Sequence, residues 1–182
     1  MTDGSVDLSK YSSKGFDRGR PFWVEWLWRL TSAIFFQSGW FPFYAPKRML
    51  LRSFGARIGR GVLIKPRVTI TFPWRVEIGD HVWIGEEAWL DSLAAIRIDS
   101  HVCISQGAYL CTGNHDYKSG TFDLRCSPIH ISKGAWIAAK SVVGPGVTAE
   151  EGAILSLGSV ATDRLEEKGI YQGNPARRIA TR

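Results

Sequence analysis

The segment IGDHVWIGEEAWLDSLAAIRIDSHVCISQGAYL, residues 78–110, carries the pattern from which the fold can be predicted. Within it an aliphatic residue returns at every sixth position, apart from one interval of eight. The spacing continues on both sides and is broken after residue 110. The full series is Ile58, Ile64, Ile70, Ile78, Ile84, Leu90, Ile98, Ile104, Leu110, Ile131, Ile137, Val143, Ala149 and Leu155.

A second column of residues follows the first at a fixed offset. Four places after twelve of the fourteen aliphatic residues stands a small or β-branched one, such as Val62, Val82, Ala108 or Ala135. A period of six matches neither the 3.6 residues of a helical turn nor the simple alternation of a sheet. It predicts an all-β solenoid, in which three short strands form a coil of about eighteen residues and about five coils stack. Short strands in a β-sandwich would not need to keep a six-residue spacing over about a hundred residues.

Several blocks of sequence resemble the hexapeptide-repeat acyltransferases. They are residues 54–59, 73–74, 78–86, 111–116, 136–139, 145–147 and 173–176. Their order and spacing are most similar to those of the WcaF-like O-acetyltransferases of colanic acid and exopolysaccharide biosynthesis. This resemblance implies a left-handed parallel β-helix, although the usual crossover between parallel strands is right-handed.

The sequence predicts three parts. Residues 1–55 form an N-terminal arm with an amphipathic helical segment, residues 56–162 form the β-helix with an inserted loop at 116–130, and residues 163–182 form a C-terminal tail. Helices are expected over 22–36 and 46–54. Glu25, Arg29 and Ser32 share one polar stripe of the first. Two interpretations stay open: the helices cap the open end of the solenoid, or their aromatic face, with Lys47, Arg48 and Arg52, rests on the inner membrane.

Composition excludes several classes. The net charge of +6 favours anionic partners, but no reading helix or stacking sheet for nucleic acid is apparent. The three cysteines contain no CxxC pair, which argues against a disulfide framework and a zinc site and favours a reducing, cytoplasmic setting. No signal peptide is recognisable in the polar first twenty residues. A carbonic anhydrase of this architecture would need a close pair of zinc-binding histidines, which the chain lacks. No metal is therefore expected.

The break in the repeat places His115 at the start of an inserted loop, where sites on rigid scaffolds are usually found. The resemblance implies that His115 is a catalytic base, and an imidazole titrates in the range that this role needs. It implies direct attack of a sugar hydroxyl on acetyl-CoA, with a backbone N–H stabilising the oxyanion. Asp116 or a backbone carbonyl is expected to orient the imidazole. The candidate acceptor-binding residues are Asp91, Asn114, Asp116 and Tyr117.

The resemblance also implies a binding site for acetyl-CoA along the later coils and a homotrimer with sites between prisms. The candidate residues are Trp136, Ala138, Ala139, Leu157, Gly158, Thr162, Arg164, Pro175 and Arg177. Asp163 stands where many relatives have a phosphate-binding lysine, which leaves Arg164 as the candidate substitute. Serine, maltose, galactosides or antibiotics as acceptors, a longer acyl group, and a non-catalytic binding scaffold remain alternatives.

Overall fold

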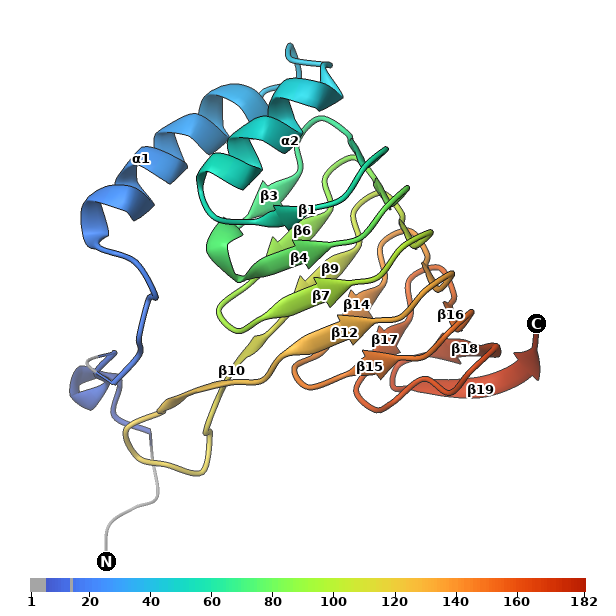
Figure 1. Ribbon diagram of the computed structural model, residues 1–182. Coiled ribbons are helices and arrows are strands. Elements are labelled where there is room, and N and C mark those ends of the chain that lie inside the picture. Colours follow the sequence, from blue (N-terminus) through green and yellow to red (C-terminus); the bar gives the residue numbers. More distant parts are fainter. Residues whose placement is uncertain (1–5, 14) are drawn as a thin grey trace, which may run out of the picture.

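The computed structural model describes residues 6–13 and 15–182; residues 1–5 and 14 of the predicted N-terminal arm lie outside the described residues. The body is a prism of three parallel sheets (Figure 1). The first sheet contains β1 (Arg57–Ile58), β4 (Val76–Ile78), β7 (Ile96–Ile98), β12 (Ile129–Ile131) and β15 (Thr148–Ala149). The second contains β2 (Leu63–Ile64), β5 (Trp83–Ile84), β8 (Cys103–Ile104), β13 (Trp136–Ile137), β16 (Ile154–Leu155), β18 (Gly169–Gly173) and β19 (Ala176–Thr181). The third contains β3 (Thr69–Ile70), β6 (Trp89–Asp91), β9 (Tyr109–Cys111), β14 (Val142–Val143) and β17 (Val160–Ala161).

The core confirms the six-residue prediction. All fourteen aliphatic positions are buried, and they pair in register from coil to coil, as in the ladder Ile58, Ile78, Ile98, Ile131 and Ala149. The second column is buried as well, with Val62, Val82 and Ala108 fully enclosed at the corners. The predicted parallel β-helix of about five coils is therefore correct.

The departures from the repeat all occur at one corner, where the third sheet passes into the first. Ile58 pairs with Ile78, twenty residues away, whereas Ile131 pairs with Ala149, eighteen residues away. The two extra residues of each early coil lie at this corner, which in the first coil contains the 3-10 turn Pro73–Arg75. In the third coil the same corner carries the insertion. The longer segments of the first three coils therefore lie along one edge of the prism, which is called the ledge below.

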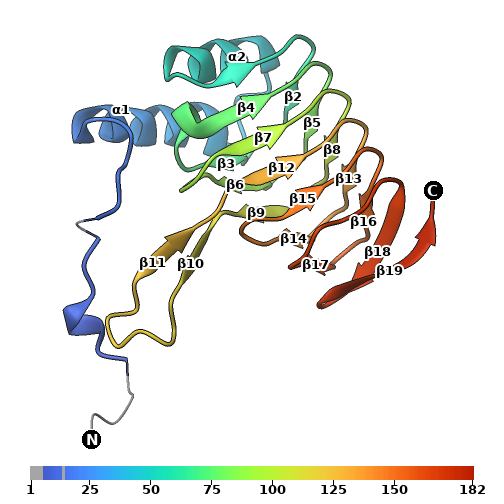
Figure 2. The ribbon, with the colours of Figure 1, turned by 60° about the horizontal axis from the view of Figure 1, so that its bottom comes forward.

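The insertion is a β-hairpin that projects from the prism (Figure 2). Strand β10 (Gly113–His115) pairs antiparallel with β11 (Leu124–Cys126), and His115 lies opposite Leu124. The excursion therefore begins before the predicted boundary of 116, and the coil resumes at Ile129 rather than after residue 130. The difference arises because the strand pairing extends to both sides of the loop.

Two helices close the N-terminal end of the prism: α1 (Phe22–Ser32), continued by a π-helical turn over Ala33–Gln37, and α2 (Tyr44–Ser53). In later coils the carbonyl of each core aliphatic residue accepts a hydrogen bond from the preceding coil, as from Gly59 N–H to Ile78 O at 2.7 Å. The first coil has no predecessor. Its three equivalent carbonyls instead accept from side chains: Ile58 from Arg52 at 2.7 Å, Ile64 from Lys47 at 3.2 Å and Ile70 from the Trp28 indole at 2.8 Å.

The other end is closed by strands rather than by the tail predicted for residues 163–182. Leu165 bridges to Ala149 in the first sheet, and β18 continues the second sheet beside β16. Strand β19 then folds back antiparallel on β18. Leu165 and Tyr171 are buried beneath this last partial coil. Their aliphatic and aromatic side chains thus extend the core beyond the regular repeat.

The polar stripe of α1 faces inward, a point that the sequence interpretation left open. Glu25 and Ser32 are only 2% and 3% exposed, and Trp28 beside them is buried against the first coil. Although burial opposes its ionisation, ion pairs with Arg18 and Arg29, each at 2.7 Å, lower the pKa of Glu25. The solvent-facing side of the helix is apolar and consists of Phe22, Trp23, Trp26, Leu27 and Leu30. This helix packs through its polar face because the arginines neutralise the buried carboxylate.

Replacing the indole that caps the third strand should destabilise the prism. Trp28→Phe keeps an aromatic ring but leaves the buried Ile70 carbonyl without its donor, and we expect a loss of about 2 kcal/mol or more in the free energy of unfolding. Trp23→Phe, on the exposed side of the same helix, should stay within about 0.5 kcal/mol. Urea unfolding measures both; equal effects would contradict the capping role.

Glu25 should make stability depend on pH. Because its pKa in the folded state lies below the ordinary value of 4.5, its contribution is present above that pH and is lost as the pH falls through the folded-state pKa. Glu25→Gln should therefore be less stable than the native protein at neutral pH. The gap should close in strong acid, where the native carboxyl is protonated. Unfolding curves across this pH range test it, and a gap independent of pH would argue against it.

Candidate active site

His115 lies at the end of β10, where the hairpin leaves the ledge. Its Nδ1 is 2.8 Å from the carbonyl oxygen of Phe122 across the hairpin. A carbonyl can only accept, so Nδ1 carries the proton and Nε2 of the neutral ring keeps its lone pair. Phe122 has a φ of 52°, a conformation rare for a large side chain, and this turn directs its carbonyl toward the imidazole. Of the two orienting groups expected from the sequence, the backbone carbonyl fills the role.

Two aromatic rings enclose the imidazole. Phe122 stacks on it, with ring centroids 4.3 Å apart and an interplanar angle of 6°. Tyr11 meets it edge-on, with ring centroids 5.6 Å apart. These contacts restrict the ring to one orientation. Sequence reasoning found neither residue: Tyr11 is remote in the chain, and Phe122 acts through its backbone and ring within an irregular loop.

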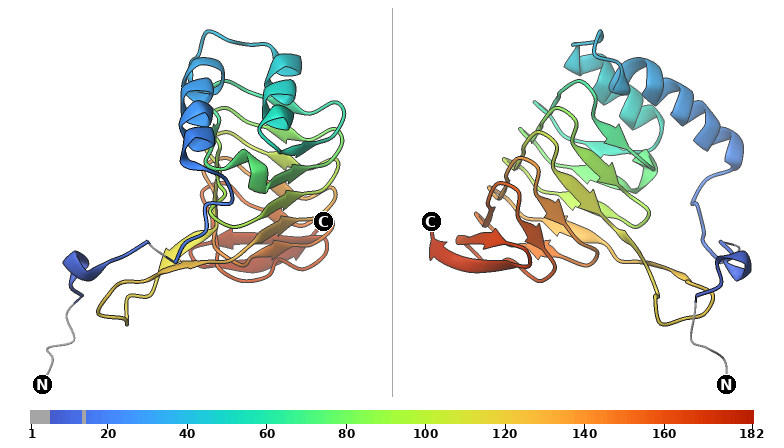
Figure 3. Two further views of the ribbon diagram at one scale, coloured as in Figure 1. Left: turned by 60° about the vertical axis from the view of Figure 1, so that its left-hand side comes forward. Right: turned by 180° about the vertical axis from the view of Figure 1, so that it is seen from behind.

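The N-terminal arm brings Tyr11 to this place. It runs from α1 along the ledge to the hairpin (Figure 3). Phe16 stacks on Phe72, and the Trp74 indole donates to the carbonyl of Arg18 at 2.8 Å. A short 3-10 turn over Leu8–Lys10 precedes Tyr11, and the N–H of Asp7 donates to Gly120 O at 2.9 Å. The arm thereby holds Tyr11 against His115.

A cavity of about 450 Å³ opens beside His115. It brings together five predicted residues, namely Asn114, His115, Asp116, Tyr117 and, from the acetyl-CoA set, Thr162, with the additional residues Lys118, Arg125, Ser127, Gly144 and Pro145. The Asn114 side chain accepts from the backbone N–H of His115 at 2.8 Å. Asp116 is ion-paired with Arg125 of β11, so it fixes the hairpin rather than the imidazole. The tip therefore offers carboxylate, amide, phenol and cationic groups around one base.

Asp91 does not line this cavity. Its carboxylate lies on the third sheet and accepts from the Thr71 hydroxyl at 2.8 Å and the Tyr109 hydroxyl at 3.2 Å. Burial, Cys111 and Asp91 together raise the pKa of Tyr109, so its hydroxyl remains a donor. The Asp91 carbonyl accepts from the Thr112 hydroxyl at 2.6 Å, directly before the hairpin. In this chain Asp91 thus supports the base of the hairpin.

The residues expected to bind acetyl-CoA lie mostly at another corner. Thr162 lines the His115 cavity. Ala138 and Ala139 stack under Leu157 and Gly158 where the second sheet passes into the third, joined by a 3.0 Å bond from Gly158 N–H to Ala139 O. Trp136 lies on the second sheet and donates to Ser105 at 2.8 Å. Within one chain, the width of the third sheet therefore lies between the His115 cavity and the corner that holds Ala138 and Gly158.

The expected phosphate-binding arginines both have carboxylate partners. Arg177 of β19 lies 3.5 Å from Asp163, and Arg164 pairs with Glu150. Pro175 lies in the turn between β18 and β19, after a cis peptide bond. Arg177 is thus placed next to Thr162 by way of Asp163, whereas Arg164 is directed to Glu150 of the fifth coil. Arg164 is thus paired with a different carboxylate from Arg177, and its role as the substitute for the missing lysine stays a prediction.

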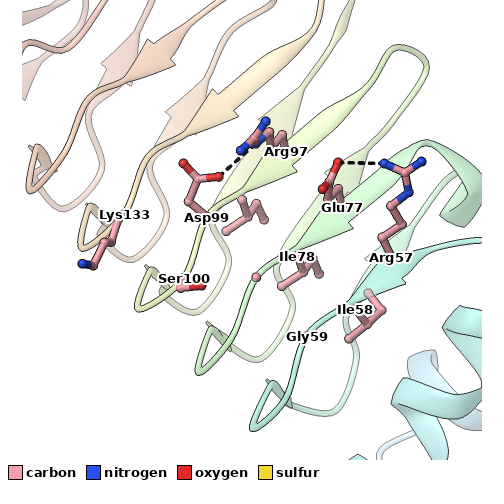
Figure 4. Close-up of a pocket in the computed structure, with 11 residues that line it drawn as sticks. Arg57, Ile58, Gly59, Glu77, Ile78, Arg97, Asp99, Ser100 and Lys133 are labelled. Atoms are coloured by element: carbon pink, nitrogen blue, oxygen red, sulfur yellow. Dashed lines mark hydrogen bonds and ion pairs between the residues drawn. The ribbon is translucent and has the colours of Figure 1, made fainter.

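A second hollow, of about 530 Å³, lies on the outer face of the first sheet (Figure 4). Its charged side chains form ion pairs along the surface, with Arg57 on Glu77 and Arg97 on Asp99. His130 nearby is held by Asp99 at 2.9 Å. Because these groups neutralise one another and no base faces the hollow, we place the candidate site at His115.

Residues 6–13 and 15–182 contain no cluster of three or more histidine, cysteine, aspartate or glutamate side chains suited to a metal ion. Within the same residues, no helix combines the length and apolar character needed to traverse a bilayer.

Comparison with known proteins gives close similarity along nearly the whole chain. WcaF of Escherichia coli (strain K12), which is named as a colanic acid biosynthesis acetyltransferase, is 40% identical over 173 residues, covering 93% of each protein. No family model matches the chain.

Solved structures share the fold. A hexapeptide-repeat acetyltransferase of Vibrio cholerae O1 biovar eltor, complexed with acetyl coenzyme A, superimposes with a TM-score of 0.70 at 24% identity, over 75% of this chain and 76% of that one. A galactoside acetyltransferase in complex with coenzyme A gives a TM-score of 0.76 at 21% identity, over 87% and 80% of the two chains. Both are coiled prisms of the same kind.

The hydrogen bond to Phe122 predicts the tautomer of His115. Nitrogen NMR, recorded where the imidazole is neutral, should show Nδ1 protonated and Nε2 unprotonated at this residue. His81, which stacks on His101 where the first sheet passes into the second, serves as an internal reference. A His115 signal with the proton on Nε2 would contradict the geometry.

Proposed function

The chain belongs to the hexapeptide-repeat acetyltransferases that include WcaF, and from this membership we propose that it transfers the acetyl group of acetyl-CoA to a sugar hydroxyl of an exopolysaccharide or related glycan. His115 is the general base. The observation that carries this assignment is the 2.8 Å contact between Nδ1 and the Phe122 carbonyl, which leaves Nε2 as a proton acceptor at a cavity of substrate size.

The reaction needs one proton transfer and one acyl transfer. Nε2 of His115 takes the proton of the acceptor hydroxyl while its oxygen bonds to the thioester carbonyl carbon. The carbonyl oxygen becomes an oxyanion, stabilised by a backbone N–H. When the carbon–sulfur bond breaks, the proton on Nε2 passes to the departing CoA thiolate. The Phe122 carbonyl favours the imidazolium that exists between these steps, because it accepts from Nδ1–H throughout.

The surroundings of His115 suit a sugar. A hydroxylated ring presents donors and acceptors on its rim and an apolar face, and the cavity offers Asn114, Asp116 and Arg125 for the rim. Tyr117 is largely exposed at the mouth and supplies a ring on which a sugar can stack. The similarity to WcaF supports an exopolysaccharide as the source of that sugar. A non-catalytic binding scaffold would not require an imidazole that is fixed by the Phe122 carbonyl, the Phe122 ring and the Tyr11 ring.

A homotrimer would complete the site. The residues expected to bind acetyl-CoA lie one corner away from His115, so the two groups meet if that corner of one prism faces the His115 cavity of its neighbour. Trp136 and Leu157, both substantially exposed, would then be covered by the neighbouring chain or by the pantetheine arm. The three thiols, free in the structure, suit a cytoplasmic enzyme.

Removing the base should abolish transfer without loss of the fold. His115→Ala should lower acceptor-dependent CoA release by roughly two to four orders of magnitude, measured with acetyl-CoA and a panel of sugars and glycan fragments. His81→Ala, a histidine away from the cavity, is the matched control and should stay near native activity. Undiminished turnover in His115→Ala would remove this residue from the mechanism.

A further inference from the structure

Helix α1 presents an apolar face to solvent. Phe22, Trp23, Trp26, Leu27 and Leu30 recur at positions i, i+1, i+4, i+5 and i+8, which is one side of a helix. All five line one shallow hollow of about 470 Å³, so the face is contiguous. Ile34, Trp40 and Phe43 are exposed beyond the end of the helix. Soluble proteins rarely leave so large an aromatic surface uncovered without a partner.

The helix cannot rotate to bury this face. Its opposite side is fixed by the bond from the Trp28 indole to Ile70, by the buried ring of Phe36 and by the Glu25 ion pairs. Turning the helix would break these contacts and expose the carbonyl that Trp28 caps. The apolar face is therefore held outward by the same interactions that close the prism.

The positive charge of the protein is concentrated in the same segment. Residues 15–60 contain eight lysines and arginines against two acidic residues, whereas the rest of the chain contains fifteen of each. The excess of +6 thus lies in the stretch that contains both helices and the start of the first coil, where Arg57 and Arg60 pair with Glu77 and Asp80 and Lys47 is buried. Arg18 and Arg20 precede α1, and Arg29 lies at the edge of its apolar face with most of its side chain exposed.

We propose that this surface docks the protein on an anionic lipid bilayer, with α1 lying in the plane of the membrane–water interface. Tryptophan and phenylalanine favour that interface because their rings are apolar and the indole keeps a polar N–H. Flanking arginines attract anionic headgroups. The helix is too short to span a membrane, which is compatible with interfacial docking.

A second copy of this chain is the less suitable occupant of the face. Two such surfaces pressed together would bring the arginines beside α1 in one copy, Arg18, Arg20 and Arg29, close to the same arginines of the other. An anionic surface relieves that repulsion while covering the same rings. The arm leads from α1 to His115, so docking would present the active site at a defined height above the lipid (Figure 3).

The test is co-sedimentation of the full-length protein with vesicles of phosphatidylcholine alone or mixed with phosphatidylglycerol. We expect binding to the anionic vesicles that weakens as salt is raised from about 0.1 M toward 1 M. Trp26→Ser/Leu30→Ser should bind at least about tenfold more weakly. The control Trp83→Ser/Ile179→Ser removes one tryptophan and one aliphatic residue of similar exposure from the second sheet and should bind like the native protein.

Light scattering and an assay with a soluble acceptor accompany the binding data. The α1 variant should keep the native mass and the native activity without vesicles, which separates this inference from the proposed reaction. Absence of binding to anionic vesicles would overturn it, as would equal binding to both vesicle types. A change of mass in the α1 variant alone would assign the face to a second copy instead.

Discussion

The hydrogen bond from one coil to the next is the interaction on which this molecule depends. Each coil donates N–H groups to the carbonyls of the core aliphatic residues in the following coil, so the three such carbonyls of the first coil have no preceding coil to donate to them. Arg52, Lys47 and Trp28 supply those donors, one for each sheet. The requirement fixes both helices against the prism, and it decides which side of α1 faces the protein. The outward aromatic surface follows directly from it.

One corner of the prism holds every irregular element of the fold. The corner where the third sheet passes into the first holds the two extra residues of the early coils. It also holds the β10–β11 hairpin and the N-terminal arm. This arrangement leaves the other two corners regular, and the core columns remain in register through the insertion. The proposed base thereby lies on a projecting hairpin. Phe122 and Tyr11 contact its ring, and the Asp116–Arg125 ion pair holds the hairpin itself.

The periodic part of the structure could be predicted from the sequence, because burial in a stacked coil imposes the same residue type at the same interval. His115 was singled out because it lies at the break in that order, within a block that resembles the acyltransferases, and its role as a base was inferred from that resemblance. Tyr11 and the Phe122 carbonyl were not, since an aromatic edge and a backbone oxygen leave no periodic signal. The polar stripe of α1 was recognised but not assigned to a side, because the count of charges on a helix does not show that Arg18 reaches back to neutralise Glu25. The last strands were read as a tail for a similar reason: β19 reverses direction, and the repeat describes only parallel coils.

The hairpin also bears on how such a molecule can change over time. Ile98 and Ile131 pair across 33 residues instead of the twenty of the preceding coil. Because the entropy of closing a loop grows only with the logarithm of its length, the added cost is roughly 0.4 kcal/mol. Chain length at this corner is therefore almost neutral for folding. Substrate-contacting segments of different size can be exchanged there while selection acts on the chemistry alone.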